Sequence, residues 1–260
     1  MSDTAPVAVV TGAGKGIGAA VARRLSDDGY DIAAIDLTFP AEADDEPDTR
    51  SRVEATGRRY AAYRADVGDR SECETIADTI LADHGRVDAL IHVAGISSRG
   101  GRIVDTTADE LTRLLAVHTL GGFHLARALV PALRSSDNAN IVLMSSLATS
   151  VPAAGSGPYM MAKAAAEALA YTLALEEAEF GIRVNIVAPG LVATDMGDKF
   201  VRAATGLDRA AKLDSGTPFG RVTRAEDVAD TVAFLVSESA RQITGQRIEV
   251  HGGLKTLSTT

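Results

Sequence analysis

The sequence predicts an α/β fold in which one doubly wound sheet of about seven parallel strands carries helices on both faces. This prediction rests on the apolar character of the expected strands and on their alternation with longer segments. Short, nearly continuous runs of Val, Ile and Ala alternate with longer amphipathic segments along the 260-residue chain. Apolar runs of this kind indicate strands covered on both faces, as in a parallel sheet between two helical layers. No repeat and no linker-like stretch divides the sequence, so we expect a single domain over residues 1–260.

The individual elements follow in order along the chain. The apolar run at 7–10 predicts the first strand, the amphipathic segment at 16–28 the first helix, and the run at 31–36 the second strand. Further strands are predicted at 60–66, 87–93, 140–144, 183–187 and 246–250. Helices are predicted between them at 71–84, 108–133, 158–180 and 225–238.

Two segments interrupt this alternation. Residues 39–49 are rich in carboxylates and predict a solvated acidic loop. Residues 194–221 lie between the last two expected strands and contain Gly197, Gly206, Gly216 and Pro218. Because a long insertion at the carboxyl ends of parallel strands lies next to the ligand crevice, we expect 194–221 to be a mobile cover over a substrate.

The composition argues against several classes of partner. The formal net charge is −9 and the isoelectric point is about 5.1, so the chain lacks the basic surface that nucleic acid or an anionic membrane requires. Cys73 is the single cysteine and lies in a predicted helix, where we expect it to pack rather than react. No uninterrupted apolar run is long enough to span a bilayer, and the first residues lack the pattern of a secretion signal. We therefore expect a cytoplasmic protein with no nucleic-acid or membrane partner and no metal site.

A glycine-rich turn joins the first strand to the first helix. It reads Thr-Gly-Ala-Gly-Lys-Gly-Ile-Gly over residues 11–18 and contains a G-x-x-x-G-x-G pattern. Glycines at this place let backbone N–H groups and the helix N-terminus approach a pyrophosphate. A glycine-rich turn alone is a weak signal, but its position between strand and helix predicts a dinucleotide site. The cofactor-binding residues expected in the turn are Gly12, Lys15, Gly16, Ile17 and Gly18.

Asp36 ends the second predicted strand, 18 residues after Gly18. A carboxylate at this distance accepts hydrogen bonds from the ribose hydroxyls of an adenosine and repels a 2′-phosphate. An ordinary turn aspartate is the alternative interpretation. Lys15 is a contrary sign, because a cation in the turn can meet a 2′-phosphate, but Leu37 and Thr38 add no second cation. We predict NAD(H) rather than NADP(H) as the cofactor.

Three polar residues stand near the start of the helix predicted at 158–180. Ser146 follows the fifth predicted strand, and Tyr159 and Lys163 share one helical face because four residues separate them. The 13 residues from Ser146 to Tyr159 are enough for a loop that returns over that face. Taken alone, a Tyr-x-x-x-Lys pattern is more often part of an ordinary amphipathic helix than of a catalytic site.

Together, Thr-Gly-x-x-x-Gly-Ile-Gly at 11–18, Ser146 and Tyr-x-x-x-Lys at 159–163 resemble the short-chain dehydrogenase/reductase family. That resemblance covers nearly the whole chain and implies a Rossmann fold. Further matches to the motifs of the family lie at 66–67, 94–95, 183–190, 194–196, 226–228 and 243–245.

The resemblance implies a role for each matched residue. Tyr159 is the implied proton donor or acceptor at the substrate oxygen, which requires a phenol pKa well below about 10. Lys163 and the positive oxidised nicotinamide would lower that pKa, and Lys163 would also bind the nicotinamide ribose. Ser146 would hold the substrate oxygen by a hydrogen bond. The implied further cofactor contacts are Asp66, Val67, Ala94, Gly95, Pro189, Gly190, Val192 and Thr194.

Two places depart from the family pattern. His92 and Val93 stand where the family usually has two asparagines before Ala94 and Gly95. His118 stands where it usually has a catalytic asparagine, whose carbonyl holds a water that relays protons to the lysine. His118 either supplies the same main-chain carbonyl and relays protons through its ring, or merely packs, and the sequence leaves both interpretations open.

The leading expectation for function is an NAD-dependent alcohol dehydrogenase or ketone reductase. The residues after Ser146 are small, which favours a modest aliphatic or alicyclic carbonyl compound as substrate. The resemblance also implies a homo-oligomer, a tetramer or dimer, formed through the helices at 108–133 and 158–180.

Two alternatives stay open. An NADPH-dependent 3-oxoacyl-[acyl-carrier-protein] reductase is disfavoured by Asp36, although Arg99 and Arg102 would be able to receive an acidic group if they are not simply solvated. A catalytically silent nucleotide-binding regulatory protein is the alternative from another class, because a fold does not guarantee a function. The intact serine, tyrosine and lysine argue against it.

Overall fold

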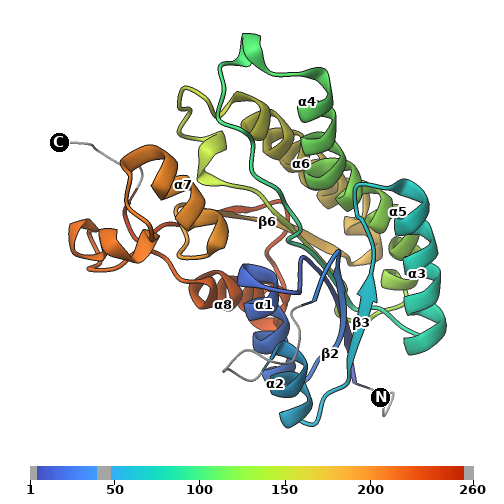
Figure 1. Cartoon of the computed structure of the whole chain (residues 1–260). Helices are drawn as coiled ribbons and strands as arrows, with labels where there is room; N and C mark the ends of the chain where they lie inside the picture. Colours follow the sequence, from blue (N-terminus) through green and yellow to red (C-terminus); the bar gives the residue numbers. More distant parts are fainter. Residues whose placement is uncertain (1–4, 40–47, 255–260) are drawn as a thin grey trace.

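The computed structural model describes residues 5–39 and 48–254, which build one sheet of seven parallel strands (Figure 1). The strands lie in the order β3-β2-β1-β4-β5-β6-β7. Their bounds are β1 (Val7–Thr11), β2 (Asp31–Asp36), β3 (Tyr60–Arg64), β4 (Ala89–His92), β5 (Asn140–Met144), β6 (Arg183–Pro189) and β7 (Arg247–Val250). The predicted doubly wound α/β sheet is confirmed.

The chain enters the sheet at β1, the third strand in this order, which pairs with β2 on one side and with the central strand β4 on the other. Val9 shows this register, because it lies opposite Ala33 of β2 and Leu90 of β4 and is fully buried. From β1 the chain builds outward to β3, and from β4 it builds outward to β7 in the opposite direction. In such sheets a crevice opens at the carboxyl ends of the two central strands, and ligands bind there.

Helices cover both faces of the sheet (Figure 1). One layer contains α1 (Gly16–Asp27), α2 (Thr49–Ala55) and α8 (Ala225–Val236). The other contains α3 (Arg70–His84), α4 (Ala108–Leu115), α5 (Gly121–Leu133) and α6 (Gly157–Glu176). A separate hydrophobic cluster fills each interface: Leu25 and Val232 belong to the first, Ile80 and Leu129 to the second, and all four are fully buried. Burial of each such side chain contributes about 1.5–3 kcal/mol, so both faces hold the sheet in place.

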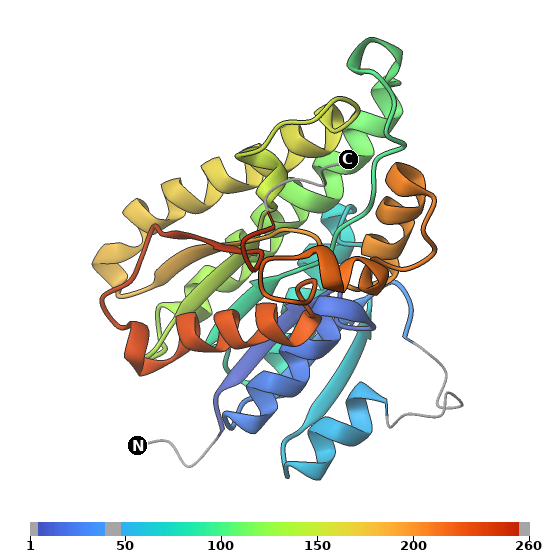
Figure 2. The same ribbon diagram turned by 90° about the vertical axis from the view of Figure 1, so that its left-hand side faces the viewer.

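The segment expected to form a cover contains a helix of its own. α7 (Asp195–Thr205) begins with Thr194, whose hydroxyl accepts a hydrogen bond from the Gly197 N–H, and ends at Gly206, which has a φ of +78°. A small cluster that includes Val201 packs α7 against the following turns. Figures 1 and 2 show α7 at the end of the sheet from which the loop after β4 also rises.

Several element boundaries differ from the prediction. β3 ends at Arg64 rather than 66, and β4 is shorter than 87–93, whereas β6 extends to Pro189. The helix predicted at 108–133 is divided by a π-helical turn at Ala116–Leu120, and the one predicted at 158–180 ends at Glu176. Short 3-10 turns lie at Ile103–Asp105, Leu147–Thr149, Ala178–Phe180, Ala210–Gly216 and Glu238–Ala240.

Helix α2 lies where no helix is predicted. Its N-cap is Asp48, whose carboxylate accepts a hydrogen bond of 2.7 Å from the Ser51 N–H. In the sequence, Asp48 belongs to a run of carboxylates, so its role as a helix cap cannot be told apart from that of a solvated charge. The rest of the predicted acidic loop, residues 40–47, lies outside the described residues.

The continuous helical segment Ala108–Leu133 is long and apolar enough, by length and composition alone, to cross a membrane, with a mean hydropathy of 1.2. Half of that stretch is buried inside the protein. A core helix of a globular protein meets the same criterion, and Leu125 and Leu129 are fully buried in the cluster beneath the sheet. The segment is therefore explained by its packing.

Candidate active site

The glycine-rich turn lies at the carboxyl end of β1, in the crevice between β1 and β4. Gly12 has a φ of +67°, which favours glycine, and a Cβ on it would lie 3.0 Å from the Cα of Ala94. The Thr11 hydroxyl accepts hydrogen bonds of 3.0 Å from the N–H groups of both Val93 and Ala94. The turn and the segment containing Ala94 and Gly95 therefore form one continuous surface.

The N-terminus of α1 fits the phosphates of a dinucleotide. Lys15 occupies the N-cap position and makes no side-chain cap hydrogen bond, so no described side chain caps the first N–H groups of this helix. A Cβ on Gly18 would lie 2.1 Å from the carbonyl oxygen of Gly12, and only glycine allows this approach of helix and turn. Uncapped N–H groups at a helix N-terminus bind anions.

Asp36 is held beside this turn at the end of β2. One carboxylate oxygen accepts a hydrogen bond of 2.8 Å from the Gly14 N–H, and the other accepts one of 3.2 Å from the Thr38 N–H. Lys15, the contrary sign for cofactor choice, forms an ion pair of 2.8 Å with Asp195 at the start of α7. The hydrogen bond and the charge of Asp195 raise the pKa of Lys15. A carboxylate is thus fixed at the turn, while the nearby cation is paired.

Asp66 and Val67 follow β3, as predicted. The Asp66 carboxylate accepts a hydrogen bond of 2.8 Å from the Gly68 N–H and forms an ion pair of 2.9 Å with Arg113 of α4. Val67 is buried, and its carbonyl accepts a hydrogen bond from the thiol of Cys73 in α3. Burial, followed by nearby carboxylates, raises the pKa of Cys73 to about 12, which fits a packing residue.

Ser146, Tyr159 and Lys163 meet at the carboxyl end of β5. Ser146 is the second residue after this strand, and its hydroxyl accepts a hydrogen bond of 3.2 Å from the Ala148 N–H. Tyr159 and Lys163 lie in the first turns of α6, with the Lys163 Nζ 5.8 Å from the centre of the Tyr159 ring. Lys163 is only 3% exposed, and its ammonium donates a hydrogen bond of 2.7 Å to the Met144 carbonyl.

The third side of the crevice comes from the end of β6. Pro189 is the last residue of this strand, and the Gly190 N–H donates to the Val250 carbonyl at 2.9 Å. Val192 is buried in an isolated bridge, and Thr194 lies 3.6 Å from the place a Cβ on Gly16 would occupy. The segments predicted to contact a cofactor therefore all lie at the carboxyl ends of the parallel strands.

A family model described as Enoyl-(Acyl carrier protein) reductase matches residues 12–255. The 2,3-dihydro-2,3-dihydroxybenzoate dehydrogenase of Bacillus subtilis (strain 168) is 34% identical over 252 residues, which is 95% of this chain and 95% of that protein. The chain belongs to the short-chain dehydrogenase/reductase family.

Two solved structures extend this comparison. A 3-oxoacyl-[acyl-carrier protein] reductase from Brucella melitensis, in complex with NAD, has a TM-score of 0.87 at 28% identity, and 98% of each chain is covered. A carveol dehydrogenase from Mycobacterium avium, also in complex with NAD, has a TM-score of 0.86 at 27% identity, with 96% of this chain and 98% of that chain covered. This short-chain dehydrogenase/reductase is thus an oxidoreductase with a Rossmann fold and an NAD(P) cofactor.

Burial dominates the ionisation of both groups on α6. It raises the pKa of Tyr159, and hydrogen bonding to Ser146 opposes that shift. It also lowers the pKa of Lys163 to about 7, and the negative charge of Glu167 opposes that shift. In the protein chain alone, burial therefore shifts the pKa of Tyr159 upward, and the low phenol pKa expected with a bound oxidised nicotinamide stays a prediction.

His118 lies inside the π-helical turn and is 1% exposed. Its Nε2 is 2.8 Å from the Ile96 carbonyl oxygen and 3.2 Å from the Ile96 amide nitrogen. Burial, followed by the charge of Lys163, lowers the pKa of His118 to about 2. The ring is neutral at physiological pH, and a π-helical turn at this position in a helix is common at functional sites.

His92, the other departure from the family pattern, links two parts of the site. Its Nδ1 lies 3.1 Å from the Thr11 hydroxyl, and its Nε2 lies 3.0 Å from the Val117 carbonyl of the π-helical turn. A Cβ on Gly122 would lie 3.1 Å from the His92 ring, so this glycine leaves room for it. His92 thereby ties the glycine-rich turn to the helix that carries His118.

Sequence reasoning missed several residues that hold these groups in place. Asp195 pairs with Lys15, and Arg113 pairs with Asp66, although no local pattern marks either pair. Glu167 lies one helical turn after Lys163, and this spacing was a usable signal. Arg247 reaches the Ser146 carbonyl from β7, 101 residues further along the chain, and nothing in the sequence indicates this contact.

Proposed function

We propose that this chain is an NAD(H)-dependent oxidoreductase that interconverts a secondary alcohol and a ketone. The observation that carries this proposal is the convergence of Ser146, Tyr159 and Lys163 at the carboxyl end of β5, beside a turn shaped for a dinucleotide. The intact group of three side chains argues against a catalytically silent nucleotide-binding protein.

In this proposal the protein positions the substrate and moves one proton. Ser146 donates a hydrogen bond to the substrate oxygen, and the Tyr159 phenol gives a proton to that oxygen in reduction or removes it in oxidation. Lys163 lies close enough to stabilise the phenolate, and its own low pKa keeps it near the point where it exchanges a proton. A bound nicotinamide supplies or accepts the hydride at the substrate carbon.

NAD(H) is the proposed cofactor, in preference to NADP(H). The Asp36 carboxylate stands where a ribose hydroxyl pair would be received, and a 2′-phosphate there would meet a negative charge. The carboxylate of Asp195 forms an ion pair with Lys15 and so offsets the positive charge that a 2′-phosphate would meet. The NAD in the complexes of the Brucella melitensis and Mycobacterium avium proteins supports the same choice.

The alternative, a 3-oxoacyl-[acyl-carrier-protein] reductase, is favoured by the similarity to the Brucella melitensis protein of that name. Against it, the Arg99 side chain lies 3.9 Å from the Glu110 carboxylate, which also accepts a hydrogen bond from the Arg99 N–H. An arginine placed near an acid is a poorer receptor for an acidic carrier.

The proposed substrate is largely apolar, and segment 194–221 is the proposed cover. Phe200 and Phe219 in that segment are 57% and 79% exposed, and Ile103 and Val104 on the loop after β4 are 55% and 75% exposed. Apolar side chains this exposed are candidates to close over an aliphatic or alicyclic ligand.

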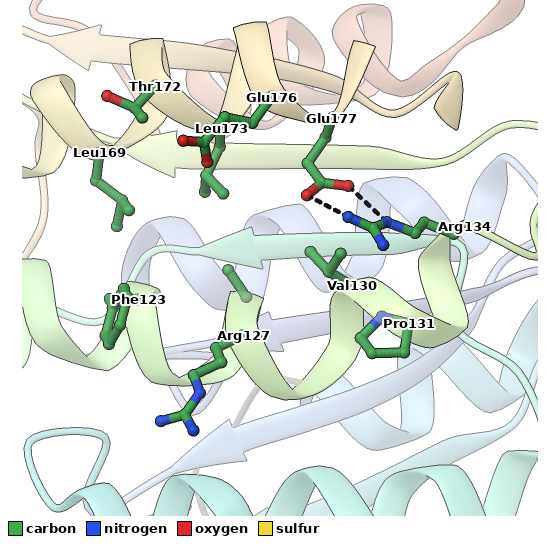
Figure 3. A pocket seen from close by; sticks show the side chains of 11 residues that line it. Phe123, Arg127, Val130, Pro131, Arg134, Leu169, Thr172, Leu173, Glu176 and Glu177 are labelled. Atoms are coloured by element: carbon green, nitrogen blue, oxygen red, sulfur yellow. Dashed lines mark hydrogen bonds and ion pairs between the residues drawn. The ribbon is translucent and has the colours of Figure 1, made fainter. Parts of the chain in front are cut away.

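A second copy of the chain is the proposed partner for the outer face of α5 and α6. A groove between these helices is lined by Phe123, Leu169 and Leu173, and the ion pair between Arg134 and Glu177 lies at one end (Figure 3). Because the groove lies between two helices that run in the same direction, the same face of another copy would complete a four-helix contact.

The decisive experiment is a screen of secondary alcohols with NAD⁺ and NADP⁺, and of ketones with the reduced forms, followed by the absorbance of the reduced nicotinamide. It includes alicyclic alcohols and a 3-oxoacyl thioester. We expect turnover with NAD(H) and an alcohol or ketone, and Tyr159→Phe should lower it by about 10²–10⁴-fold while cofactor binding persists. Turnover confined to the thioester with NADPH would favour the alternative, and turnover retained in Tyr159→Phe would overturn the mechanism.

A further inference from the structure

Arg247, at the start of β7, makes contacts that the proposed chemistry does not use. β7 is the outermost strand of the sheet, and β6 separates it from β5 and the serine that follows β5. The Arg247 side chain nevertheless crosses this distance and donates a hydrogen bond of 3.0 Å to the Ser146 carbonyl and one of 2.8 Å to the Thr149 hydroxyl. It therefore holds the loop on which Ser146 lies at two points.

Glu167 of α6 completes this arrangement. Its Oε1 accepts hydrogen bonds from the Arg247 Nε at 2.8 Å, from the Thr149 hydroxyl at 2.7 Å and from the Ser145 hydroxyl. Lys163 lies one turn earlier on the same helix and holds the Met144 carbonyl. α6 thus fixes Met144 and Ser145, the two residues immediately before Ser146, while Arg247 fixes Ser146 itself.

The contacts continue along one face of β7. Arg247 donates a hydrogen bond of 2.6 Å to Glu249, and the other carboxylate oxygen of Glu249 lies 3.3 Å from His251. His251 packs against Gly190, because a Cβ on that glycine would lie 2.8 Å from the His251 Cβ. The same chain of contacts therefore joins the loop of Ser146 to the turn after β6.

Both members of the central ion pair are enclosed and charged. The side chains of Arg247 and Glu167 are each 14% exposed. The pKa of Glu167 is lowered overall. Burial alone would raise it, but the hydrogen bonds from Ser145, Arg247 and Thr149 have the larger combined effect. For Arg247 the effect of burial is likewise outweighed by its two carboxylate partners, which raise the pKa. Charge-assisted hydrogen bonds are stronger than neutral ones, and here a single planar guanidinium donates to Glu167, Glu249, Thr149 and the Ser146 carbonyl.

We propose that Arg247, oriented by Glu167, is a positioning residue that holds Ser146 in the geometry needed to receive the substrate oxygen. This inference rests on the proposed function, in which Ser146 binds that oxygen. Loss of the contact would leave Ser146 present but displaced, and a displacement of about 1 Å at such a group lowers turnover by up to about a hundredfold. Arg247 touches neither substrate nor cofactor in this account, so binding of NAD(H) should not depend on it.

The test is a double-mutant cycle of Arg247→Met and Ser146→Ala, with turnover and the dissociation constant of NADH as separate readouts. We expect Arg247→Met to lower kcat about tenfold or more with NADH affinity unchanged, and to lower it far less in the Ser146→Ala background. Arg247→Lys keeps a cation but not the planar guanidinium, and Glu167→Gln keeps an acceptor but not the charge. The kcat of each of these variants should lie between that of wild type and that of Arg247→Met.

Arg86→Met is the matched control. Arg86 pairs with Asp88 at 2.6 Å, and Asp88 directly precedes β4, at the end of the sheet opposite the serine loop. This variant should lose stability without losing kcat. An equal loss of kcat from Arg247→Met in both serine backgrounds, a parallel loss of NADH affinity, or a comparable loss of kcat in Arg86→Met would overturn the proposal.

Hydrogen exchange separates this inference from the proposed function. The amides of Ala148, Thr149 and Val151 are hydrogen-bonded within the loop. They should exchange about tenfold faster in Arg247→Met or Arg247→Lys and at the wild-type rate in Arg86→Met. If the wild-type chain turns over no alcohol or ketone, the proposed function fails, but the exchange rates still show whether Arg247 restrains the loop of Ser146. Unchanged exchange in both Arg247 variants would refute that restraint, whatever the activity.

Discussion

The ring of His118 meets the ring of Tyr159 edge to face, with their centres 5.2 Å apart and their planes at 88°. This is a favourable geometry for two aromatic rings, and it places a buried, neutral imidazole against the proposed acid/base residue. Nδ1 of His118 is buried and has no hydrogen-bond partner among the described residues, while Nε2 is bound to Ile96. The ring therefore supports Tyr159 by packing, and its low pKa opposes a role as a charged proton carrier.

The first prediction concerns this contact. His118→Asn should leave the shape of the pH–rate profile unchanged between about pH 5 and 8, because the His118 pKa of about 2 puts its titration outside that range. Loss of the ring contact should lower kcat only modestly, by about tenfold or less. Initial rates over this pH range check the prediction, and a limb of the profile that disappears in His118→Asn would restore the relay interpretation.

The second prediction concerns cofactor choice. Asp36→Ala should weaken NADH binding by about 10- to 100-fold, because a carboxylate that accepts hydrogen bonds from the ribose is lost. NADPH binding should be unchanged or tighter, since the repulsion toward a 2′-phosphate is removed as well, and adding Leu37→Arg should reverse the preference. Fluorescence titration with both reduced cofactors measures this. Lys15→Ala serves as the comparison and should change the ratio of the two affinities little, because Lys15 is exposed and paired with Asp195.

The third prediction concerns the glycine-rich turn. Gly18→Ala should destabilise the protein by about 1–3 kcal/mol or more and abolish NADH binding, because the new Cβ would lie 2.1 Å from the Gly12 carbonyl oxygen. Urea unfolding and fluorescence titration report the two effects. Gly216→Ala is the control: a Cβ there meets nothing within 4 Å, so stability and binding should not fall.

The cofactor end of this site was predictable because its parts lie close together in the sequence. Gly12, Gly16 and Gly18 occupy one turn between a strand and a helix, and the spacing of Tyr159 and Lys163 is a single helical turn, so local geometry brings each set together. The alternation of apolar runs likewise predicted every strand of the sheet, because burial on both faces leaves a strong pattern.

What the sequence could not predict depends on long-range contacts or on weak local signals. The hydrogen bond from Arg247 to the Ser146 carbonyl depends on the pairing of β7 with β6, which brings together residues that are far apart in the sequence. The π-helical turn around His118 keeps the apolar periodicity of the helix, so no break in pattern marks it. The high pKa of Tyr159 follows from burial, which a spacing argument cannot supply.

The fourth prediction concerns the charge of Lys163. Its pKa is about 7 in the folded chain and 10.5 as an ordinary lysine, so between these values the unfolded state binds more protons than the folded state. The free energy of unfolding of the cofactor-free protein should therefore rise as the pH rises from about 7 toward 10, relative to Lys163→Met, which has no such titration. At pH 6 the variant should be the more stable of the two, because it removes a buried cation. Urea unfolding of both proteins across this range checks the sign, and parallel curves would contradict a lowered pKa.

The fifth prediction concerns the outer face of α5 and α6. Leu175 on α6 is 83% exposed, and Tyr171 and Phe123 are each 41% exposed on the same pair of helices. A stable interface buries such side chains, and a charge placed among them would have to be desolvated. We expect the wild-type chain to form a homo-oligomer, and Leu175→Glu to shift it toward monomer by raising the dissociation constant at least about tenfold, as measured by light scattering across a concentration series. Val104→Glu is the control, because Val104 is 75% exposed on a loop away from this face and should leave the oligomer intact. A wild-type chain that stays monomeric at high concentration would reject this face as an interface.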